Sequence, residues 1–583
     1  MNTRIALQSW IRENQIYYGD NLDVLRNNID KESVDLCYID PPFNSNRDYS
    51  QIYLNVGKEK ENNAQAQAFI DTWTWNDSAI QGLAEIKANV GGALTTQSID
   101  LIKGLEIVLG KDSLFAYLVS MTLRIAQIHR VLKPTGSFYL HCDPTASHYL
   151  KLVCDGIFCP NGGEYRNEIT WKRTTTHNDA KQGAKQFGRV HDIVFFYTKS
   201  SKNWIFNTVY ENYSAAYMDS SYNKMDSNGR RFKSSDLSAA KGGGDTSYNW
   251  NGTFPPTGRF WAYSRANMEK FESEDRLYYS KTGKPYLKHY LDEMLGISPD
   301  DLWTDITPLS AKSAEKLGYP TQKPEALLER IIKSSSNEGD VVLDAYCGCG
   351  TTVAVAQRLK RNWIGVDITY QSISLILKRL EDQDKDALNN VTIAGVPRDM
   401  ASAVALANKS DDKTRKEFEK WMVLAYSKNR AMINDKKGGD KGIDGIAYIA
   451  DRIENGAVET EKVIFSVKSN KNVTQAMLRE LLGTVEREKA ACGFLLMLYP
   501  APALVKESKQ LGEYINAFTG NSYPKIQVIC VEDLLNGEVM NLPNPIEVTK
   551  KAEQNEGKQI SLDGDLDWKN KPLIKPVCWK LSG

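Results

Sequence analysis

A short apolar run that ends in an acid, two prolines and an aromatic ring is the first stretch that could do chemistry. Residues 34–39 read Val-Asp-Leu-Cys-Tyr-Ile, and Asp40, Pro41, Pro42 and Phe43 follow directly. Such runs are typical of buried parallel strands, and two prolines cannot continue a central strand. The chain must therefore turn there, with a carboxylate, a carbonyl and a ring held at one place. A strand-ending turn with no further role is the alternative interpretation of these residues alone.

A second stretch has the pattern of a nucleoside-binding unit. Residues 341–344 predict a strand, 351–359 a helix and 363–367 a second strand, with a tight loop at 345–350. The glycines of the loop would let the backbone approach a ligand. Asp367, which ends the second strand, could accept hydrogen bonds from both ribose hydroxyls.

The type of nucleoside follows from what surrounds Gly348 and Gly350. Val353 stands where the dinucleotide fingerprint has its third glycine, and no Gly-Lys-Ser/Thr occurs, so a phosphate-binding P-loop is excluded. Asp344 would repel a pyrophosphate but suits a cationic ligand that carries an amino acid. This favours S-adenosylmethionine, with NAD as the alternative.

Both stretches belong to a regular alternation of strands and helices. Strands are predicted at 16–20, 34–40 and 137–141, and helices at 22–25, 114–132 and 148–158. The alternation indicates an α/β fold with a doubly wound parallel sheet. Asp40 and Asp344 should then lie at the ends of neighbouring strands, at the switch point where ligands bind. The polar region 44–113 is too long for a connection, and we expect helices there that fold over this site.

A basic segment interrupts the alternation at about residue 169. It is rich in Gly, Ser and Tyr, and between residues 166 and 288 it has 20 Lys and Arg against 12 Asp and Glu, an excess of 8. Irregular basic loops with aromatic side chains suit the recognition of nucleic acid. A solvated surface could produce the same excess.

Composition sets the broad class. With 583 residues, 41% hydrophobic and 25% charged, the chain is expected to form two or three soluble globular domains. The formal net charge of +0 gives no nucleic-acid signature for the whole chain. Nine scattered cysteines favour reduced thiols, and no signal-peptide core or membrane-spanning run is seen. We therefore expect a cytoplasmic protein.

Three motifs in one chain order carry a resemblance to a known family. They are Asp40–Phe43, then Tyr-Pro-Thr-Gln-Lys-Pro at 319–324, then Leu-Asp-Ala-Tyr-Cys-Gly-Cys-Gly-Thr-Thr at 343–352. This order resembles the β-class amino-methyltransferases of DNA found in restriction–modification systems. The resemblance covers roughly residues 10–400. The family's usual Asp-Pro-Phe before the glycines is here Asp344-Ala345-Tyr346, which keeps the acid and an aromatic ring.

The resemblance implies a role for each motif. Asp40 and the carbonyl of Pro41 would accept the two hydrogens of an exocyclic amine, and Phe43 would stack on a base flipped out of the duplex. Asp367 would bind ribose, and Asp20 would contact the adenosine. The cofactor-binding residues implied by resemblance are Asp20, Thr321, Lys323, Pro324, Asp344, Tyr346, Gly348, Gly350, Thr351 and Asp367; the catalytic ones are Asp40, Pro41, Pro42 and Phe43.

The target is expected to be an amine. Carbon-5 cytosine methylation uses a Cys nucleophile, usually after a Pro, and the order Pro-Cys is absent. Asp-Pro-Pro motifs usually accompany adenine-N6 chemistry, so we expect N6 methylation of adenine. Cytosine-N4 methylation is the alternative, and a dinucleotide oxidoreductase is a more distant one.

The last third resembles a different family. Asp444 begins a predicted strand and Lys468 ends another, which is the skeleton of a metal-dependent nuclease. Residues 410–540 resemble the Mrr-like branch of the PD-(D/E)xK nucleases, with Asp444 as metal ligand and Glu419 as a first-helix acid. Ser466 stands where Glu, Asp or Gln is expected, and Asp440 is a candidate substitute. A Mg²⁺-dependent nuclease and a non-cleaving DNA-binding module are both open.

The expected organisation has five parts. They are a catalytic half at 1–168, a target-recognition insertion at 169–310, a cofactor-binding half at 311–400, a nuclease-like domain at 410–545 and a tail at 546–583. The expected partner is double-stranded DNA. A restriction subunit and a second copy of the chain are further candidate partners, and no association with a membrane is expected.

Overall fold

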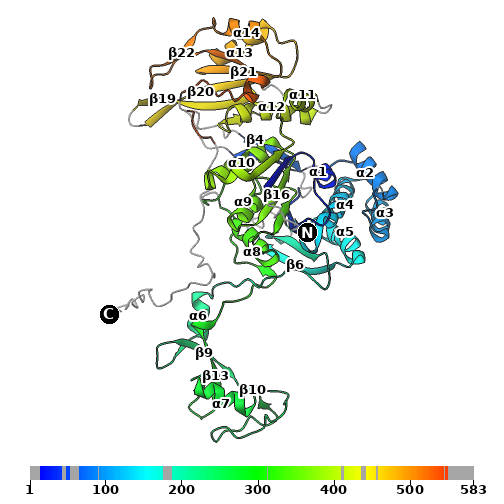
Figure 1. The fold of residues 1–583 in the computed structure, drawn as a ribbon, viewed down its shortest axis with the longest axis vertical. Coiled ribbons are helices and arrows are strands. Elements are labelled where there is room, and N and C mark those ends of the chain that lie inside the picture. The colour runs from blue at the N-terminus through cyan, green and yellow to red at the C-terminus, as the bar shows by residue number, and fades with distance from the viewer. Residues whose placement is uncertain are drawn as a thin grey trace, which may run out of the picture.

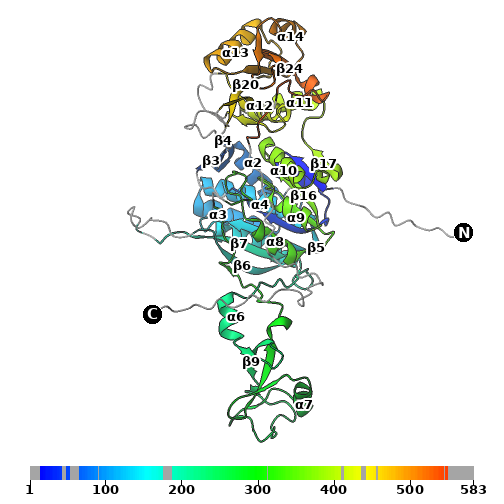
Figure 2. The ribbon, with the colours of Figure 1, turned by 90° about the vertical axis from the view of Figure 1, so that its left-hand side faces the viewer.

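The computed structural model describes residues 14–42, 47–52, 65–71, 73–89, 91–174, 185, 187–310, 313–408, 412–434, 442–454, 457–543 and 545–548. These residues form three tiers (Figures 1 and 2). A central domain contains α1 to α5 and α8 to α10, a smaller module with α6 and α7 lies on one side of it, and a C-terminal domain, with α11 beside α12, lies on the other. Among the described helices, none is long and apolar enough to cross a membrane.

The central domain is built on one nine-stranded sheet, in the order β14-β6-β7-β5-β2-β15-β16-β1-β17. Its strands are β1 (Asn14–Tyr18), β2 (Val34–Ile39), β5 (Leu132–Cys142), β6 (Glu164–Lys172), β7 (His191–Thr198), β14 (Leu302–Trp303), β15 (Val341–Asp344), β16 (Asn362–Asp367) and β17 (Val391–Ala394). β2 pairs in parallel with β5 on one side and β15 on the other, with Cys37 opposite Leu343. The expected adjacency of the strands that lead to Asp40 and Asp344 is therefore present.

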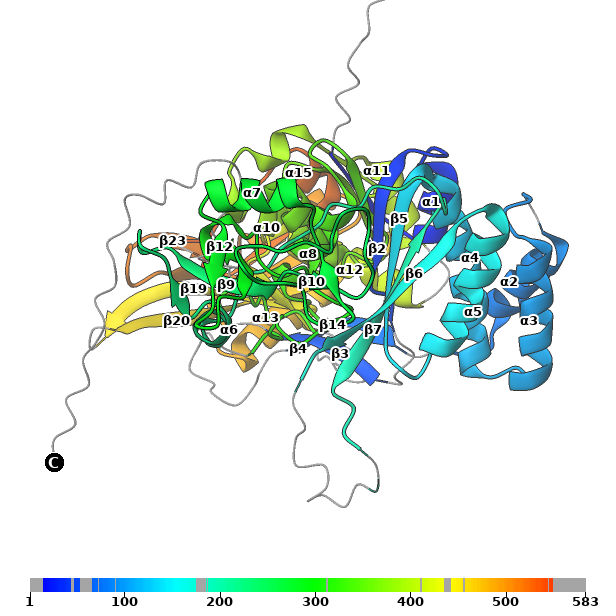
Figure 3. The same cartoon turned by 90° about the horizontal axis from the view of Figure 1, so that it is seen from below.

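Helices cover both faces of this sheet (Figure 3). One apolar core lies under α1 (Asn21–Asn27), α2 (Asp77–Ala88), α3 (Thr96–Leu109), α4 (Ser113–Val131) and α5 (Ser147–Phe158). The other lies under α8 (Glu325–Ser335), α9 (Thr351–Arg358) and α10 (Tyr370–Gln383). The central strands β2, β15 and β16 are nearly continuous apolar runs because both faces of the sheet are buried there.

Three features differ from the sequence-based expectation. The sheet is mixed, because β7 runs antiparallel to both β5 and β6. The irregular segment was expected to begin at about residue 169, yet β6 and β7 are strands of the central sheet. The region 44–113 contains the expected helices, α2 and α3, but also an antiparallel pair of strands, β3 (Arg47–Ile52) with β4 (Gln65–Asp71), which was not expected.

The module with α6 and α7 is joined to the central domain by two neighbouring chain segments. Glu211 and Ile297 form an antiparallel bridge, in which the Glu211 N–H donates to the Ile297 carbonyl at 2.8 Å and the Ile297 N–H donates back at 2.9 Å. We call residues 212–296, beyond this bridge, the distal module. Its elements are α6 (Ala215–Ser221), β8 (Lys224–Met225), β9 (Arg231–Asp236), β10 (Ser238–Ala239), β11 (Phe260–Trp261), α7 (Arg265–Ser273), β12 (Leu277–Tyr279) and β13 (Pro285–Tyr290).

The C-terminal domain is a second α/β unit. Its sheet has the order β18-β19-β20-β21-β24. The elements are α12 (Asp412–Tyr426), β18 (Ala431–Ile433), β19 (Gly445–Glu454), β20 (Ala457–Lys468), α13 (Gln475–Arg487), β21 (Cys492–Met497), α14 (Pro502–Ser508), β22 (Glu513–Ile515), β23 (Ser522–Pro524), β24 (Ile526–Cys530) and α15 (Val531–Leu535). The helix α11 (Met400–Ala407) precedes it. Of the tail expected at 546–583, only residues 546–548 lie within the described part of the chain.

Candidate active site

A cavity of about 1270 Å³ opens at the carboxyl ends of β2, β15, β16 and β1. It is lined by the ends of these strands, by α2 and α4, and by the loop that precedes α8. Of the residues expected to act here, the cavity lining includes Asp20, Asp40, Pro41, Pro42, Thr321, Lys323, Asp344, Tyr346, Gly348, Thr351 and Asp367. Pro324 and Gly350 do not line it, and Phe43 lies outside the described residues.

Asp40 follows the last residue of β2 and faces a lysine. Its Oδ2 accepts a hydrogen bond from the Lys323 ammonium; the Asp40 side chain is 17% exposed and the Lys323 side chain 9%. Asp40 Oδ1 is buried and has no hydrogen-bond partner among the described residues. A buried carboxylate oxygen without a partner is unusual, so this atom is available to a ligand that donates a hydrogen.

Lys323 is presented by a loop with a fixed backbone. Thr321 adopts a positive φ of 61°. The Gln322 side-chain amide donates to the Glu315 carbonyl at 2.7 Å and accepts from the Leu317 N–H at 2.9 Å. Pro324 is the N-cap of α8 and does not line the cavity.

Asp344 and Asp367 end two neighbouring strands, where Asp344 is buried and Asp367 is partly buried. Burial raises the pKa of Asp344 to about 7, against the hydrogen bonds donated by Thr352 and the Tyr346 N–H. Burial likewise raises the pKa of Asp367 to about 6. Asp367 accepts from the Gly348 N–H and the Thr369 N–H, each at 2.9 Å. Two poorly hydrated acids at one wall favour a ligand that brings positive charge and hydroxyl donors.

The loop between these acids needs its glycines. Gly348 has φ of 53°, and a Cβ there would lie 3.1 Å from the Tyr319 ring. Gly350 has φ of 75°, and a Cβ there would lie 2.7 Å from Ile376. Gly348 thus keeps the cavity wall open, whereas Gly350 permits the packing of the loop on α10.

Asp20 reaches the cavity with its carboxylate already engaged. Arg124, from α4, donates to its two oxygens at 3.1 and 2.8 Å, and the Leu22 N–H donates to it at 2.7 Å as the N-terminal cap of α1. The guanidinium therefore lies at the same wall of the cavity. Sequence reasoning missed Arg124, although a charged residue inside the apolar helix 114–132 was a usable signal.

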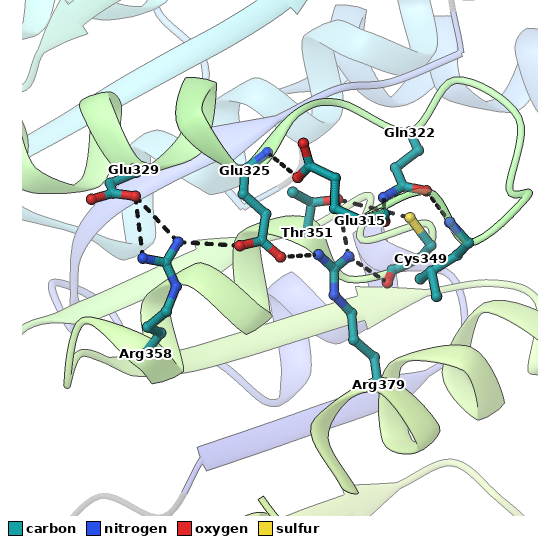
Figure 4. A network of polar contacts seen from close by, with 9 residues as sticks. Glu315, Gln322, Glu325, Glu329, Cys349, Thr351, Arg358 and Arg379 are labelled. Atoms are coloured by element: carbon teal, nitrogen blue, oxygen red, sulfur yellow. Dashed lines mark hydrogen bonds and ion pairs between the residues drawn. The ribbon is translucent and has the colours of Figure 1, made fainter. Parts of the chain in front are cut away.

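A buried polar network fixes the glycine loop, residues 345–350, from the side away from the cavity (Figure 4). Arg379 of α10 donates to the Cys349 carbonyl at 3.4 Å, to Thr351 Oγ1 at 3.3 Å and to Glu325 at 2.5 Å. Glu325 also contacts Arg358 at 3.2 Å, and its N–H donates to Glu315 at 3.0 Å. The network joins the glycine loop to the segment that carries Lys323, so both halves of the site are held by one set of contacts.

Three further residues of the cavity wall come from the C-terminal domain. Lys416, Glu417 and Lys420, all on α12, line the cavity with the acids described above. No sequence pattern marked them, because the packing of α12 against the central domain is a tertiary property.

The predicted nuclease residues lie together in the C-terminal sheet. Gly445 pairs with Phe465, which brings Asp444 beside Ser466 near the end of β20, where Lys468 follows. Asp444 Oδ2 accepts from the Val467 N–H at 2.6 Å, so the carboxylate fastens the two strands. Glu419 lies on α12 and is partly buried. Asp440 lies outside the described residues.

The described acids of this second site are not grouped as metal ligands. Within the described ranges, no group of three or more His, Cys, Asp or Glu side chains is arranged to hold a metal ion. Ser466 is 4% exposed and supplies a hydroxyl where a second acid was expected. The described residues therefore do not fit Mg²⁺, which prefers several oxygen ligands including carboxylates.

Two family models match the chain. A model described as DNA methylase, of the N6 and N4 type, matches residues 34–378. A model described as restriction endonuclease, of the Mrr type, matches residues 411–503. The C-terminal domain is thus an Mrr-like restriction endonuclease domain.

Individual proteins are similar over shorter spans. Type II methyltransferase M.EcaI of Enterobacter cloacae is 32% identical over 266 residues, which is 45% of this chain and 57% of that protein. The StyLTI Mod subunit, a type III restriction-modification enzyme of Salmonella typhimurium, is 26% identical over 58% of this chain and 49% of that protein. DNA adenine methyltransferase YhdJ of Escherichia coli is 26% identical over 63% of this chain and 82% of that protein. The chain thus spans about half the length of the first two of these relatives.

The similarity of this chain to solved structures is low. The crystal structure of the M1.HpyAVI–SAM complex is 15% identical over 63% of this chain and 98% of that chain, with a TM-score of 0.30. A TM-score this low supports no conclusion about function.

Proposed function

The chain belongs to the DNA methylase family of N6 and N4 amino-methyltransferases, and we propose that it transfers a methyl group from S-adenosylmethionine to the N6 amine of adenine in double-stranded DNA. One observation carries the proposal. Asp40 presents a buried carboxylate oxygen without a hydrogen-bond partner to a cavity that also contains Asp344 and Asp367. An acceptor for an amine hydrogen and a site for a cationic nucleoside thus share one space.

The cofactor fits the residues of the cavity. The two desolvated acids favour a ligand with positive charge, and Gly348 leaves room where a Cβ would touch Tyr319. Asp367 would accept from the ribose hydroxyls, and Asp344 would face the positive end of the ligand. Bound S-adenosylmethionine supplies an electrophilic methyl group on a cationic sulfur.

The protein's part in the reaction is to reshape the amine. An exocyclic amine conjugated to a base is a poor nucleophile, because its lone pair is delocalised into the ring. Asp40 Oδ1 accepts one amine hydrogen and the Pro41 carbonyl accepts the other, which draws the nitrogen toward a tetrahedral geometry. Positioning and electrostatic stabilisation supply the remaining rate enhancement. The base must leave the duplex to reach this site, at a cost of a few kcal/mol.

Lys323 has a supporting role in this mechanism. Its ammonium holds Asp40 Oδ2, so the carboxylate has one orientation and Oδ1 alone is left to the base. The lysine also balances one of several acids around the cavity, which would otherwise repel each other.

Two features support adenine over cytosine. Asp40 precedes two prolines, the motif form associated with adenine-N6 chemistry, and the relative YhdJ is named a DNA adenine methyltransferase. The excess positive charge between residues 166 and 288 supports double-stranded DNA as the partner. We further propose that the distal module recognises the target sequence.

The test is transfer of a labelled methyl group from S-adenosylmethionine to duplex DNA, followed by digestion to nucleosides and mass spectrometry. We expect N6-methyldeoxyadenosine, and a loss of at least about a hundredfold in rate for Asp40→Ala. The matched control is Asp100→Ala, which removes an exposed acid on α3. N4-methyldeoxycytidine as the product would overturn the choice of base. Cofactor binding without methylation of any DNA would overturn the proposal as a whole.

For the C-terminal domain we propose DNA binding without cleavage. The buried Ser466 in place of an acid and the use of Asp444 to join two strands support this role. The test is incubation of the chain with duplex DNA and Mg²⁺ or Mn²⁺. Cleavage that is lost in both Asp444→Ala and Lys468→Ala would overturn it.

A further inference from the structure

The cofactor cavity has a wall that the methyltransferase sheet does not supply. Lys416, Glu417 and Lys420 of α12 line it together with Asp344 and Asp367. We propose that α12 of the C-terminal domain completes the S-adenosylmethionine site, and that Glu417 positions the adenosine end of this site. The inference rests on the proposed use of this cofactor and names the residues that couple the two domains.

Glu417 is attached directly to the central domain. Its Oε2 accepts from the Tyr370 N–H at 2.9 Å and from the Tyr18 hydroxyl at 3.4 Å. Tyr370 is the first residue of α10, and the N–H groups of a first helical turn have no partner within the helix. A carboxylate at this place satisfies one of them and complements the positive end of the helix dipole.

The contact made by Glu417 lies next to the acid expected to bind ribose. Asp367 and Tyr370 are joined by two residues, and Asp367 accepts from the N–H and the hydroxyl of Thr369 at 2.9 and 3.1 Å. The segment 367–370 is therefore fixed at both ends, by Gly348 on the cavity side and by Glu417 on the other. A displacement of α12 would change the position of Asp367.

The interface around Glu417 is a continuous apolar core. Phe418, Trp421 and Met422 of α12 are fully or almost fully buried in the same cluster as Ile373 of α10 and Leu406 of α11. Domains joined by small polar contacts move relative to each other, whereas a large apolar interface holds them together. The apolar cluster therefore continues from α12 into α10 and α11.

A second contact lies further along the same interface. Glu547 pairs with Lys378 of α10 at 2.7 Å and with Arg430, which follows α12, at 3.1 Å. The C-terminal domain is thus held to α10 at more than one place, including Glu417 and Glu547.

The chemistry of the wall suits the nucleoside part of the cofactor. Lys416 and Lys420 provide ammonium groups, which only donate hydrogen bonds, and Lys420 is held by Glu417 at 3.3 Å. Purine ring nitrogens and ribose oxygens are acceptors. Because the cofactor would contact both domains, its binding and the packing of α12 against the central domain must favour each other. Each must change the equilibrium constant of the other by the same factor.

The experiment measures the dissociation constant of S-adenosylmethionine by calorimetry for the full chain and for variants at residue 417. We expect Glu417→Ala to weaken binding about tenfold, because two donors lose their acceptor. Glu417→Gln keeps an acceptor oxygen and should restore binding to within about threefold of wild type. In methylation assays, KM for the cofactor should rise in Glu417→Ala while kcat at saturating cofactor stays unchanged.

The matched control is Glu381→Gln, which removes an exposed acid at the other end of α10. Wild-type affinity in Glu417→Ala, or an equal loss in Glu381→Gln, would overturn the inference. Hydrogen exchange of the wild type gives an independent reading: residues 412–426 should gain protection when cofactor is added, and unchanged exchange there would also overturn it. If the wild type binds no S-adenosylmethionine, the proposed function fails instead.

Discussion

Asp40 and Lys323 meet across 283 residues of sequence, and their pairing decides what Asp40 can do. A carboxylate that must accept a hydrogen from a substrate amine works only in one orientation. Lys323 fixes this orientation and leaves the other oxygen unpartnered. The two side chains are therefore expected to act as a unit, and effects at one should depend on the presence of the other.

Replacing the lysine tests this unit. We predict that Lys323→Met lowers the rate of methyl transfer about a hundredfold, because Asp40 loses both its orientation and its counter-charge. Lys323→Arg, which keeps a donor, should retain more of the activity. Single-turnover methylation measures the effect. When Lys323→Met is added to Asp40→Asn, the further loss should be less than about threefold, and independent losses would contradict the unit.

The buried acids at the cofactor end predict a pH dependence. Asp344 and Asp367, with pKa values of about 7 and 6, are neutral at low pH and charged at high pH. Only the charged forms attract a cationic ligand. We predict that S-adenosylmethionine binds about tenfold more weakly at pH 6 than at pH 8, and that Asp344→Asn removes most of this difference. Calorimetry at several pH values measures it.

The stability of the protein should change in the opposite direction. A raised pKa means that the folded state holds protons more tightly than the unfolded state, so this contribution is full below the unfolded pKa and is lost as pH rises through the folded pKa. For Asp344 the loss falls between about pH 4 and pH 7. The cofactor-free protein should therefore gain most in melting temperature from added cofactor at pH 8. An equal gain at pH 6 and pH 8 would contradict this account.

At the scale of elements, the network around Arg379 joins three helices and two loops. Arg379 is 1% exposed and bridges the glycine loop to Glu325, the first residue of α8. Lys323 lies two residues before Glu325, so the same bridge sets the positions of the glycine loop and of the lysine that holds Asp40. A side chain without contact to the cavity can thus control both.

This predicts an effect on cofactor affinity from outside the cavity. Arg379→Met should weaken binding of S-adenosylmethionine about tenfold, because it removes hydrogen bonds to Cys349 and Thr351. Arg358→Met is the matched control, since Arg358 pairs with Glu325 and Glu329 on the outer side and does not touch the loop. Calorimetry compares the two. A loss in Arg358→Met as large as in Arg379→Met would contradict a role of the loop contacts.

The elements that carry regular patterns could be predicted from the sequence. The strand before Asp40 and the strand–loop–helix–strand unit at 341–367 are found within one or two residues of the expected bounds. The helix expected at 114–132 spans Ser113–Val131. These segments have strong periodicity and clear ends, and their parallel pairing follows from the βαβ order.

Other features depend on contacts that no local pattern encodes. β7 has a strand-like apolar run, Ile193 to Tyr197, but it lies between polar, glycine-containing segments whose composition favoured irregular structure. The pairing of Lys323 with Asp40 and the packing of Glu417 against Tyr370 are set by tertiary structure alone. The distal module likewise has residues that could reach base edges, yet loops carry no general code for the sequence they would read.

At the scale of the whole molecule, the distal module is an insertion with a narrow base. The chain enters and leaves it through the Glu211–Ile297 bridge. Gly296 has φ of 121°, and a Cβ there would lie 2.1 Å from the Glu211 carbonyl, so only glycine allows the two segments to approach. Arg330 of α8 contacts both Glu211 and Asp305, which ties this base to the central domain. The module has its own apolar core around Trp250 and Trp261.

This architecture predicts that the distal module can be removed without loss of the cofactor site. Replacing residues 212–296 by Asn-Gly should close the bridge as a two-residue hairpin, the loop for which Asn-Gly is preferred. The shortened chain should bind S-adenosylmethionine with the wild-type dissociation constant, because the module contributes no residue to the cavity. It should lose methylation of the wild-type target sequence, because the residues proposed to reach the base edges are removed with the module. Calorimetry and sequencing of methylated plasmid measure the two properties separately. Methylation of the unchanged target by the shortened chain would show that recognition lies elsewhere, whereas loss of cofactor binding would show that the module supports the central domain.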